Sequence, residues 1–300
     1  MDIRVLRNFI MVVRESGVTA AAEMLRISQP TLSRQMKDLE REMGATLFVR
    51  GNRGRAFGLT DEGRLLYRRA GEIVELADRA KVEISSTDGI GGDVHIAAAQ
   101  SAVMRIVGRA AVRVRRRYPG IRVRLHDDYG ANIVERLNNG LADFGVLVQP
   151  IDMGRFDHLP LPGGDEMGVL MRPDDPLASN SAVRAEDLRG VPIIMPQGAL
   201  ERRDLSGWFG SEGVHLDIVG TMNLSYNASC FVQEGYGCAL GFGGMVDESE
   251  GNDLCFRPLD PPMRAKLSIA WRNGLPLPPA AAAFLETLKG VVEQEEDRRI

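Results

Sequence analysis

The segment SQPTLSRQ, from Ser28 to Gln35, begins a predicted helix that extends to about Gly44. Ser28 is a suitable N-cap, and Pro30 is tolerated because it falls in the first turn. The apolar residues have the spacing of a stripe buried along one helix face; they are Leu32, Met36, Leu39 and Met43. The other face is polar, with donors and acceptors of the lengths that suit base edges and phosphates. We expect contacts with double-stranded DNA from Gln29, Pro30, Thr31, Ser33, Arg34 and Lys37.

A second helix is predicted just before this one, with Thr19 as its cap. Its small residues Ala20, Ala21 and Ala22 allow the two helices to cross closely. Two short helices joined by a tight turn form a helix-turn-helix, in which the second helix enters the major groove. An ordinary helical hairpin is the alternative that this segment alone leaves open.

Several further blocks in residues 1 to about 88 occur in the order and spacing of the LysR-type transcriptional regulators. The blocks are VTAAAEML (18–25), SQPTLSRQMKDLE (28–40), LFVR (47–50) and LTDEG (59–63), preceded by Leu6 and Phe9 of a first helix. The N-terminal part therefore resembles the DNA-binding arm of that family. The resemblance implies a winged helix-turn-helix domain over residues 1–59, in which Phe48 anchors a two-stranded wing. It also implies that Arg50, Arg53 and Arg55 of the wing contact phosphate or the minor groove.

The charge distribution favours DNA contact at one end of the chain. Residues 1–69 contain 13 Lys and Arg against 8 Asp and Glu, a net charge of +5. Because the whole chain has a net charge of −4, the remainder has a net charge of −9. A basic N-terminal part joined to an acidic body is typical of a protein in which only one end meets nucleic acid.

A long helix is predicted from Thr60, its cap, to about Ile84, followed by a polar hinge, so that residues 60–88 form a linker. Asp61 and Glu62 place negative charge at the positive end of the helix dipole. Apolar residues alternate spacings of four and three, which indicates a heptad seam between two copies of the chain. The predicted dimerisation residues are Leu66, Ala70, Ile73, Ala77, Ala80 and Ile84. The alternative is a helix that packs on its own domain.

Residues 89–300 alternate predicted strands and helices, a rhythm that indicates an α/β fold with a mainly parallel sheet. The pattern restarts near Glu166, which predicts two lobes: lobe I over about 92–162 and 264–300, and lobe II over about 163–263. This arrangement resembles the effector domain of LysR-type regulators, which is similar to periplasmic solute-binding proteins. The segment VQEGYGCALGF (232–242) resembles a glycine motif of the family but has Phe242 and Gly243 where Leu-Pro is frequent.

A small-molecule effector is expected between the lobes, where the carboxyl ends of the strands meet. Ser101 directly follows the first strand and begins a helix, where a hydroxyl and free N–H groups can hold an anion. The other candidates also follow strands or begin helices, and the complete set is Ser101, Tyr129, Gln149, Gln197, Gly198 and Asn223. A simple N-cap role explains Ser101 or Asn223 equally well. The basic run Arg113, Arg115, Arg116 and Arg117 is interpreted as solvated surface, so an organic acid follows only from the family.

Other kinds of chemistry have little support in the sequence. The four histidines, at 95, 126, 158 and 215, show no metal-ligand spacing, and no cofactor or metal is expected. Cys230, Cys238 and Cys255 form no CxxC pair, which fits a reducing, cytoplasmic location. We expect no membrane span and no enzymatic activity. Two alternatives remain: a redox-sensing regulator that uses Cys230 and Cys238, and a cytosolic solute-binding protein whose N-terminal arm serves assembly.

The expected protein is a LysR-type regulator that binds a near-palindromic promoter site as a homodimer or homotetramer. Its fold class is an α/β effector domain of two lobes, periplasmic-binding-protein-like, preceded by an all-α winged helix-turn-helix domain and a long linker helix.

Overall fold

The computed structural model describes residues 1–49, 57–85, 90–150, 154–202, 208, 216–247 and 253–298. The chain forms two compact units, Met1–Thr87 and Asp88–Ile300. Among the described residues, no helix has the length and apolar character needed to cross a membrane.

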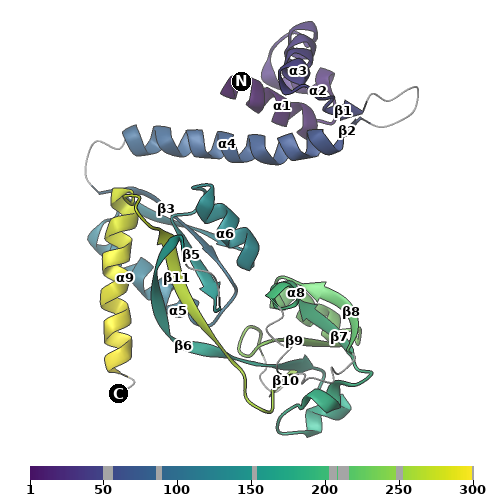
Figure 1. The fold of residues 1–300 in the computed structure, drawn as a ribbon, viewed down its shortest axis with the longest axis vertical. Helices are drawn as coiled ribbons and strands as arrows, with labels where there is room; N and C mark the ends of the chain where they lie inside the picture. The colour runs from purple at the N-terminus through teal and green to yellow at the C-terminus, as the bar shows by residue number, and fades with distance from the viewer. Residues whose placement is uncertain are drawn as a thin grey trace. The chain divides into compact units, whose positions relative to one another are not determined.

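The N-terminal unit consists of helices and one short two-stranded sheet (Figure 1). Its elements are α1 (Ile3–Arg14), α2 (Val18–Leu25), α3 (Gln29–Met43), β1 (Phe48–Val49), β2 (Gly58–Leu59) and α4 (Asp61–Ser85). One apolar core joins the first three helices to the sheet and to the first half of α4.

Helix α3 begins as the sequence predicts, because Ser28 is its N-cap and the Ser28 hydroxyl accepts a hydrogen bond from the Thr31 N–H at 3.3 Å. Two other predictions for this helix pair, the burial of Met43 and the cap at Thr19, were wrong. Met43 is 37% exposed because it lies in the last turn, beyond the part of α3 that packs on the core. Helix α2 begins at Val18 after an extended Gly17, so Thr19 is not its cap.

Strands β1 and β2 form the antiparallel wing, with Phe48 opposite Leu59. The Phe48 ring lies 5.5 Å from that of Phe9 and 5.3 Å from that of Phe57, measured between centroids. Because Phe48 is only 9% exposed, it anchors the wing to the core, as the resemblance implies.

Helix α4 begins after Thr60, whose hydroxyl accepts a hydrogen bond from the Gly63 N–H at 2.9 Å, as expected of a cap. The first two residues of the predicted dimer seam contact the core of their own unit. Ala70 is fully buried and Leu66 packs on the same core, so both residues serve the unit itself. Ile73 and Ala80 are exposed and Ala77 is half-buried, whereas the side chain of Ile84 lies outside the described residues.

Lobe I of the C-terminal unit contains a sheet with helices on both faces (Figure 1). Its elements are β3 (Gly92–Ala98), α5 (Met104–Arg117), β4 (Ile121–Asp127), α6 (Gly130–Asn138), β5 (Phe144–Val148), β11 (Arg264–Arg272) and α9 (Pro279–Asp297). Strands β4, β3 and β5 are parallel, and β11 pairs antiparallel with β5. One core lies between the sheet and helices α5 and α9, and a smaller core lies under α6.

Lobe II repeats this plan with fewer helices. Its elements are β7 (Pro192–Pro196), α7 (Gln197–Arg202), β8 (Asp217–Met222), α8 (Ser225–Gln233), β9 (Cys238–Phe242) and β10 (Cys255–Pro258), with two short 3-10 helices at Pro176–Ser179 and Ala185–Leu188. Strand β7 is parallel to both β8 and β9. The sequence did not indicate β10, which pairs with β6.

Strand β6 (Phe156–Met171) belongs to both lobes because it pairs with β11 in its first part and with β9 and β10 in its last part. Together β6 and β11 connect the lobes. This continuous strand was missed, since the predicted pattern simply restarted near Glu166.

Candidate functional site

The polar face of α3 is open. Gln29, Pro30, Thr31, Arg34 and Lys37 are exposed, and Ser33 is partly exposed. The Arg34 side chain is 86% exposed, and its Nε lies 4.0 Å from an Asp38 carboxylate oxygen, a contact at the limit of an ion pair. These side chains are therefore available to a partner at the N-terminal half of the helix.

Two polar residues of α3 hold the unit together instead of facing outward. The Asn8 amide donates to Gln35 Oε1 at 2.8 Å, which ties α3 to α1. Glu40 Oε1 accepts a hydrogen bond from the Leu47 N–H at 2.9 Å, which fixes the strand that begins the wing. This role of Glu40 was not predicted from the sequence. Arg50, Arg53 and Arg55 lie outside the described residues.

A cavity of about 370 Å³ lies between the two lobes of the C-terminal unit. Its wall is mostly apolar, and the only charged side chains among its described lining residues are Asp128 and Arg264. The larger apolar members are Val148, Met167, Met222, Phe242 and Met263. Its volume lies within the range of small-molecule sites.

Four of the six predicted effector residues line this cavity: Tyr129, Gln149, Gly198 and Asn223. They come from both lobes, at strand ends and helix starts. Gln197 lies beside them, because its amide donates a hydrogen bond to the Tyr129 hydroxyl at 3.0 Å.

Two hydrogen bonds between described residues connect the lobes at the cavity. One is the bond from Gln197 to Tyr129. In the other, Gln100 Oε1 accepts from the Ser225 N–H at 2.7 Å, which satisfies the backbone at the start of α8. Gln100, Tyr129 and Ser225 all line the cavity. Gln100 was not predicted from the sequence, although it directly precedes Ser101.

Ser101, the remaining predicted residue, is not among the residues that line the cavity. The residue is 8% exposed, and its hydroxyl accepts the Val103 N–H at 3.0 Å. The adjacent Ala102 N–H donates to Asp165 Oδ1 at 3.2 Å. Burial raises the pKa of the Asp165 carboxyl above its ordinary value of 3.8, although hydrogen bonds from the Ser101 hydroxyl and the Ala102 N–H act in the opposite direction.

The cysteines are unsuited to a redox pair. Cys230 is exposed on α8, whereas Cys238 is buried in β9. Burial, together with the neighbouring carboxylate of Asp175, raises the pKa of the Cys238 thiol to about 12. Because the thiolate is the reactive form, a raised pKa disfavours reaction of the Cys238 thiol at neutral pH.

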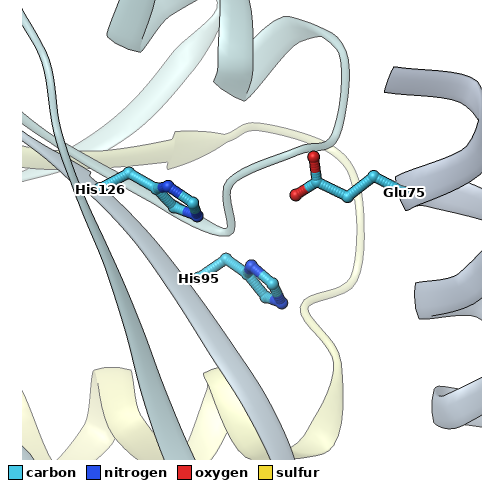
Figure 2. A group of neighbouring side chains, drawn as sticks. All are labelled: Glu75, His95 and His126. Atoms are coloured by element: carbon cyan, nitrogen blue, oxygen red, sulfur yellow. The ribbon is translucent and has the colours of Figure 1, made fainter. Parts of the chain in front are cut away.

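Two of the dispersed histidines are brought together by the sheet. Figure 2 shows the rings of His95 on β3 and His126 on β4, which are stacked with centroids 6.4 Å apart. Glu75, which the figure also labels, belongs to α4 of the N-terminal unit. The parallel pairing of β3 with β4 causes this juxtaposition, and no sequence spacing could have revealed it. Two imidazoles are half the ligands of a closed zinc site.

Taken together, these features define a winged helix-turn-helix protein with a two-lobed ligand-binding unit. Sequence comparison agrees, since residues 3–64 match the family described as bacterial regulatory helix-turn-helix protein, lysR family, and residues 87–293 match the LysR substrate binding domain. The chain belongs to the LysR family of DNA-binding transcriptional regulators.

Individual relatives extend over the whole chain. The Hca operon transcriptional activator HcaR of Escherichia coli is 31% identical over 299 residues, covering 95% of this chain and 96% of its own. The crystal structure of CbnR, a LysR family transcriptional regulator, is 20% identical with a TM-score of 0.73 and covers 97% of this chain and 99% of its own. CbnR in complex with its target DNA gives a TM-score of 0.71 at 20% identity, covering 97% of this chain and 100% of its own.

Proposed function

We propose that this regulator recognises a near-palindromic promoter site through α3 and the wing, and that a small-molecule effector in the interlobe cavity alters its geometry on DNA. The contacts assigned to DNA are those of Gln29, Pro30, Thr31, Ser33, Arg34 and Lys37, with Arg50, Arg53 and Arg55 of the wing. The observation that carries the proposal is the open polar face of α3 beside a well-packed core.

Electrostatics supports the DNA-binding part. The net charge of +5 over residues 1–69 attracts phosphate, and the N-terminus of α3 adds the positive end of its dipole. Arg34 sits one turn into the helix, where side chains of a recognition helix meet base edges. CbnR, which has this fold, has been crystallised with its target DNA.

We propose that the chain acts as a homodimer or homotetramer that pairs through α4. Leu65 and Leu76 are 51% and 45% exposed, and they lie on the same side of the helix as Ile73 and Ala80. At 3.6 residues per turn, these four residues occupy an arc of about 80°. The opposite side packs on the core through Ala70 and Val74. The exposed stripe is therefore a second apolar face that a second copy of α4 can cover.

The cavity supports the effector part, with Tyr129, Gln149, Gly198 and Asn223 in its wall and Gln197 beside it. An effector shifts the lobes only if it binds one lobe arrangement more tightly than another. The relatives are transcriptional regulators, and we propose that this chain likewise regulates promoter DNA in the cytoplasm and catalyses no reaction.

Gel-shift titration of Arg34→Ala tests the DNA-binding part. The probe is a DNA fragment selected from a random pool by the wild-type protein. Loss of a base contact costs about 1–3 kcal/mol, so binding should weaken about 5- to 150-fold. Arg116→Ala is the matched control, because Arg116 is an exposed arginine of α5 in the other unit. Equal affinities for Arg34→Ala and wild type would contradict the assignment of α3.

A further inference from the structure

The position at the start of α5 that would suit an effector's carboxylate is already taken by a carboxylate of the chain. Asp165 Oδ1 accepts the Ala102 N–H, and the Ser101 hydroxyl also hydrogen-bonds to this carboxyl. The next backbone donor, the Val103 N–H, is satisfied by Ser101 Oγ. The hydroxyl and the two N–H groups that could hold an external anion are thus used internally.

Asp165 lies directly behind the wall of the interlobe cavity and is not itself a lining residue. It lies on β6 opposite Ala265 of β11, and Ala265 lines the cavity. Asp165 is 4% exposed, and among the described residues its Oδ2 has no hydrogen-bond partner. No salt bridge to Asp165 is present in the described part of the chain. A buried carboxylate without a cation repels a second carboxylate placed beside it.

We propose that Asp165 fills the anion position at the start of α5, so that the cavity takes an apolar effector that bears no carboxylate. This inference rests on the proposed function of the cavity and narrows the chemical class of its ligand.

The rest of the wall fits such a compound. Met167, Met222 and Phe242 supply apolar contact area. Gln149 and Asn223 supply uncharged donors and acceptors for a hydroxyl, carbonyl or amide group. Asp128, whose Oδ1 accepts the Tyr129 N–H at 2.9 Å and the Asn132 amide at 2.7 Å, adds negative potential. Arg264 is exposed, so water screens its charge.

A rescue experiment on the full chain tests the proposal. Asp165→Ala empties the anion position, and we expect a lower melting temperature that added acetate or formate raises, while equal acetamide does not. Wild type and Asp157→Ala should not respond to acetate, because Asp157 is an exposed carboxylate of the same strand. Failure of acetate to rescue Asp165→Ala, or an equal response of wild type, would overturn the proposal.

Asp165→Asn keeps the inference testable where the alanine variant does not fold, because the amide retains the shape and an acceptor for the Ala102 N–H. The probes are benzoate and benzamide, compared by their dissociation constants. In wild type, benzoate should bind about tenfold more weakly than benzamide, because the like charge of Asp165 repels it in a half-buried site. In Asp165→Asn the ratio of the benzoate to the benzamide dissociation constant should approach one. The same ratio in both proteins would contradict the proposal.

Different results would contradict the proposed effector role of the cavity and the proposed exclusion of carboxylates. If wild type binds carboxylates tightly and its affinity for DNA responds to them, the regulator remains and only the exclusion of acids is wrong. If no compound in the cavity changes DNA affinity although acetate rescues Asp165→Ala, the anion position is as described and the proposed role of the cavity is wrong.

Discussion

Substitution of Gly63 by alanine should strongly destabilise the N-terminal unit. Gly63 lies in the first turn of α4, where a Cβ atom would come within 2.1 Å of the Leu47 carbonyl oxygen. Ordinary contacts between such atoms are about 3.5 Å, so the backbone of one element must move by more than 1 Å. The glycine of LTDEG is therefore required by a close approach of two chain segments.

Leu47 cannot move freely to relieve this clash. Its carbonyl accepts the Thr60 N–H at 3.1 Å, and its N–H is held by Glu40 at 2.9 Å. Overpacking costs about 1–3 kcal/mol, and disruption of one hydrogen bond adds about 1 kcal/mol. Alanine is favoured over glycine in a helix by about 1 kcal/mol, which offsets part of the loss. We expect Gly63→Ala to lower the free energy of unfolding by about 1–3 kcal/mol.

Gly71→Ala is the matched control on the same helix. Its Cβ would meet no heavy atom within 4 Å, so only the helix propensity remains. We expect this variant to gain about 0.5–1 kcal/mol. The two substitutions are chemically identical and should have opposite signs.

Urea unfolding distinguishes the two units. Circular dichroism at 222 nm reports helices of both units, whereas both tryptophans, Trp208 and Trp271, lie in the C-terminal unit. With a slope near 1 kcal/mol/M for a unit of this size, Gly63→Ala should lower the midpoint of the N-terminal transition by about 1–3 M. The fluorescence midpoint should stay unchanged where the units unfold independently. A Gly63→Ala midpoint at or above that of Gly71→Ala would refute the steric argument.

Three further predictions concern single side chains. Ser28→Ala removes the N-cap of α3 and should lower the stability of the N-terminal unit by about 1 kcal/mol, visible in the same urea titration; an unchanged midpoint would show that the cap is dispensable. Cys230 should react rapidly with a thiol reagent at pH 8 while Cys238 reacts only on unfolding, because burial raises the pKa of Cys238 to about 12. Mass spectrometry of the labelled peptides measures the two labelling rates. Equal rates would contradict the burial of Cys238. The pKa of Asp165 is raised above 3.8 in the folded chain. The stability of wild type relative to Asp165→Asn should therefore be highest below about pH 4 and should fall as the pH rises through the folded pKa. A difference in urea midpoints that does not change between pH 4 and 7 would contradict the buried charge.

The sequence predicts local features of α3 and α4 well because the physical causes are local. The cap at Ser28, the cap at Thr60 and the buried stripe through Leu32 each depend on residues within one or two turns. The packing of Ala70 of α4 could not be predicted, because its cause is not local. Periodicity shows that Ala70 is on an apolar face, but only tertiary packing shows that α1 already covers that face.

The residues at the interlobe cavity show the same difference between causes that sequence patterns reveal and causes that they do not. Tyr129 and Asn223 were predicted because α/β topology brings strand ends together, and both line the cavity. Ser101 was predicted by the same rule, yet its surroundings include Asp165, which is 64 positions along the chain and reaches α5 through the continuous strand β6. A partner so distant in sequence leaves no signal near Ser101. The pairing of His95 with His126 is hidden for the same reason.

The interlobe hydrogen bonds explain how ligand occupancy can be linked to lobe geometry in a cavity of this kind. The bonds from Gln197 to Tyr129 and from Ser225 to Gln100 are both between uncharged groups, and each contributes about 0.5–1.5 kcal/mol. Together they amount to about 1–3 kcal/mol, which is the usual size of an allosteric coupling free energy. Gln100, Tyr129 and Ser225 also line the cavity, so a bound compound that competes for these groups necessarily distinguishes between lobe arrangements. Differential affinity of this kind is what a ligand needs in order to shift a conformational equilibrium, and here the residues that supply it are the residues that hold the lobes together.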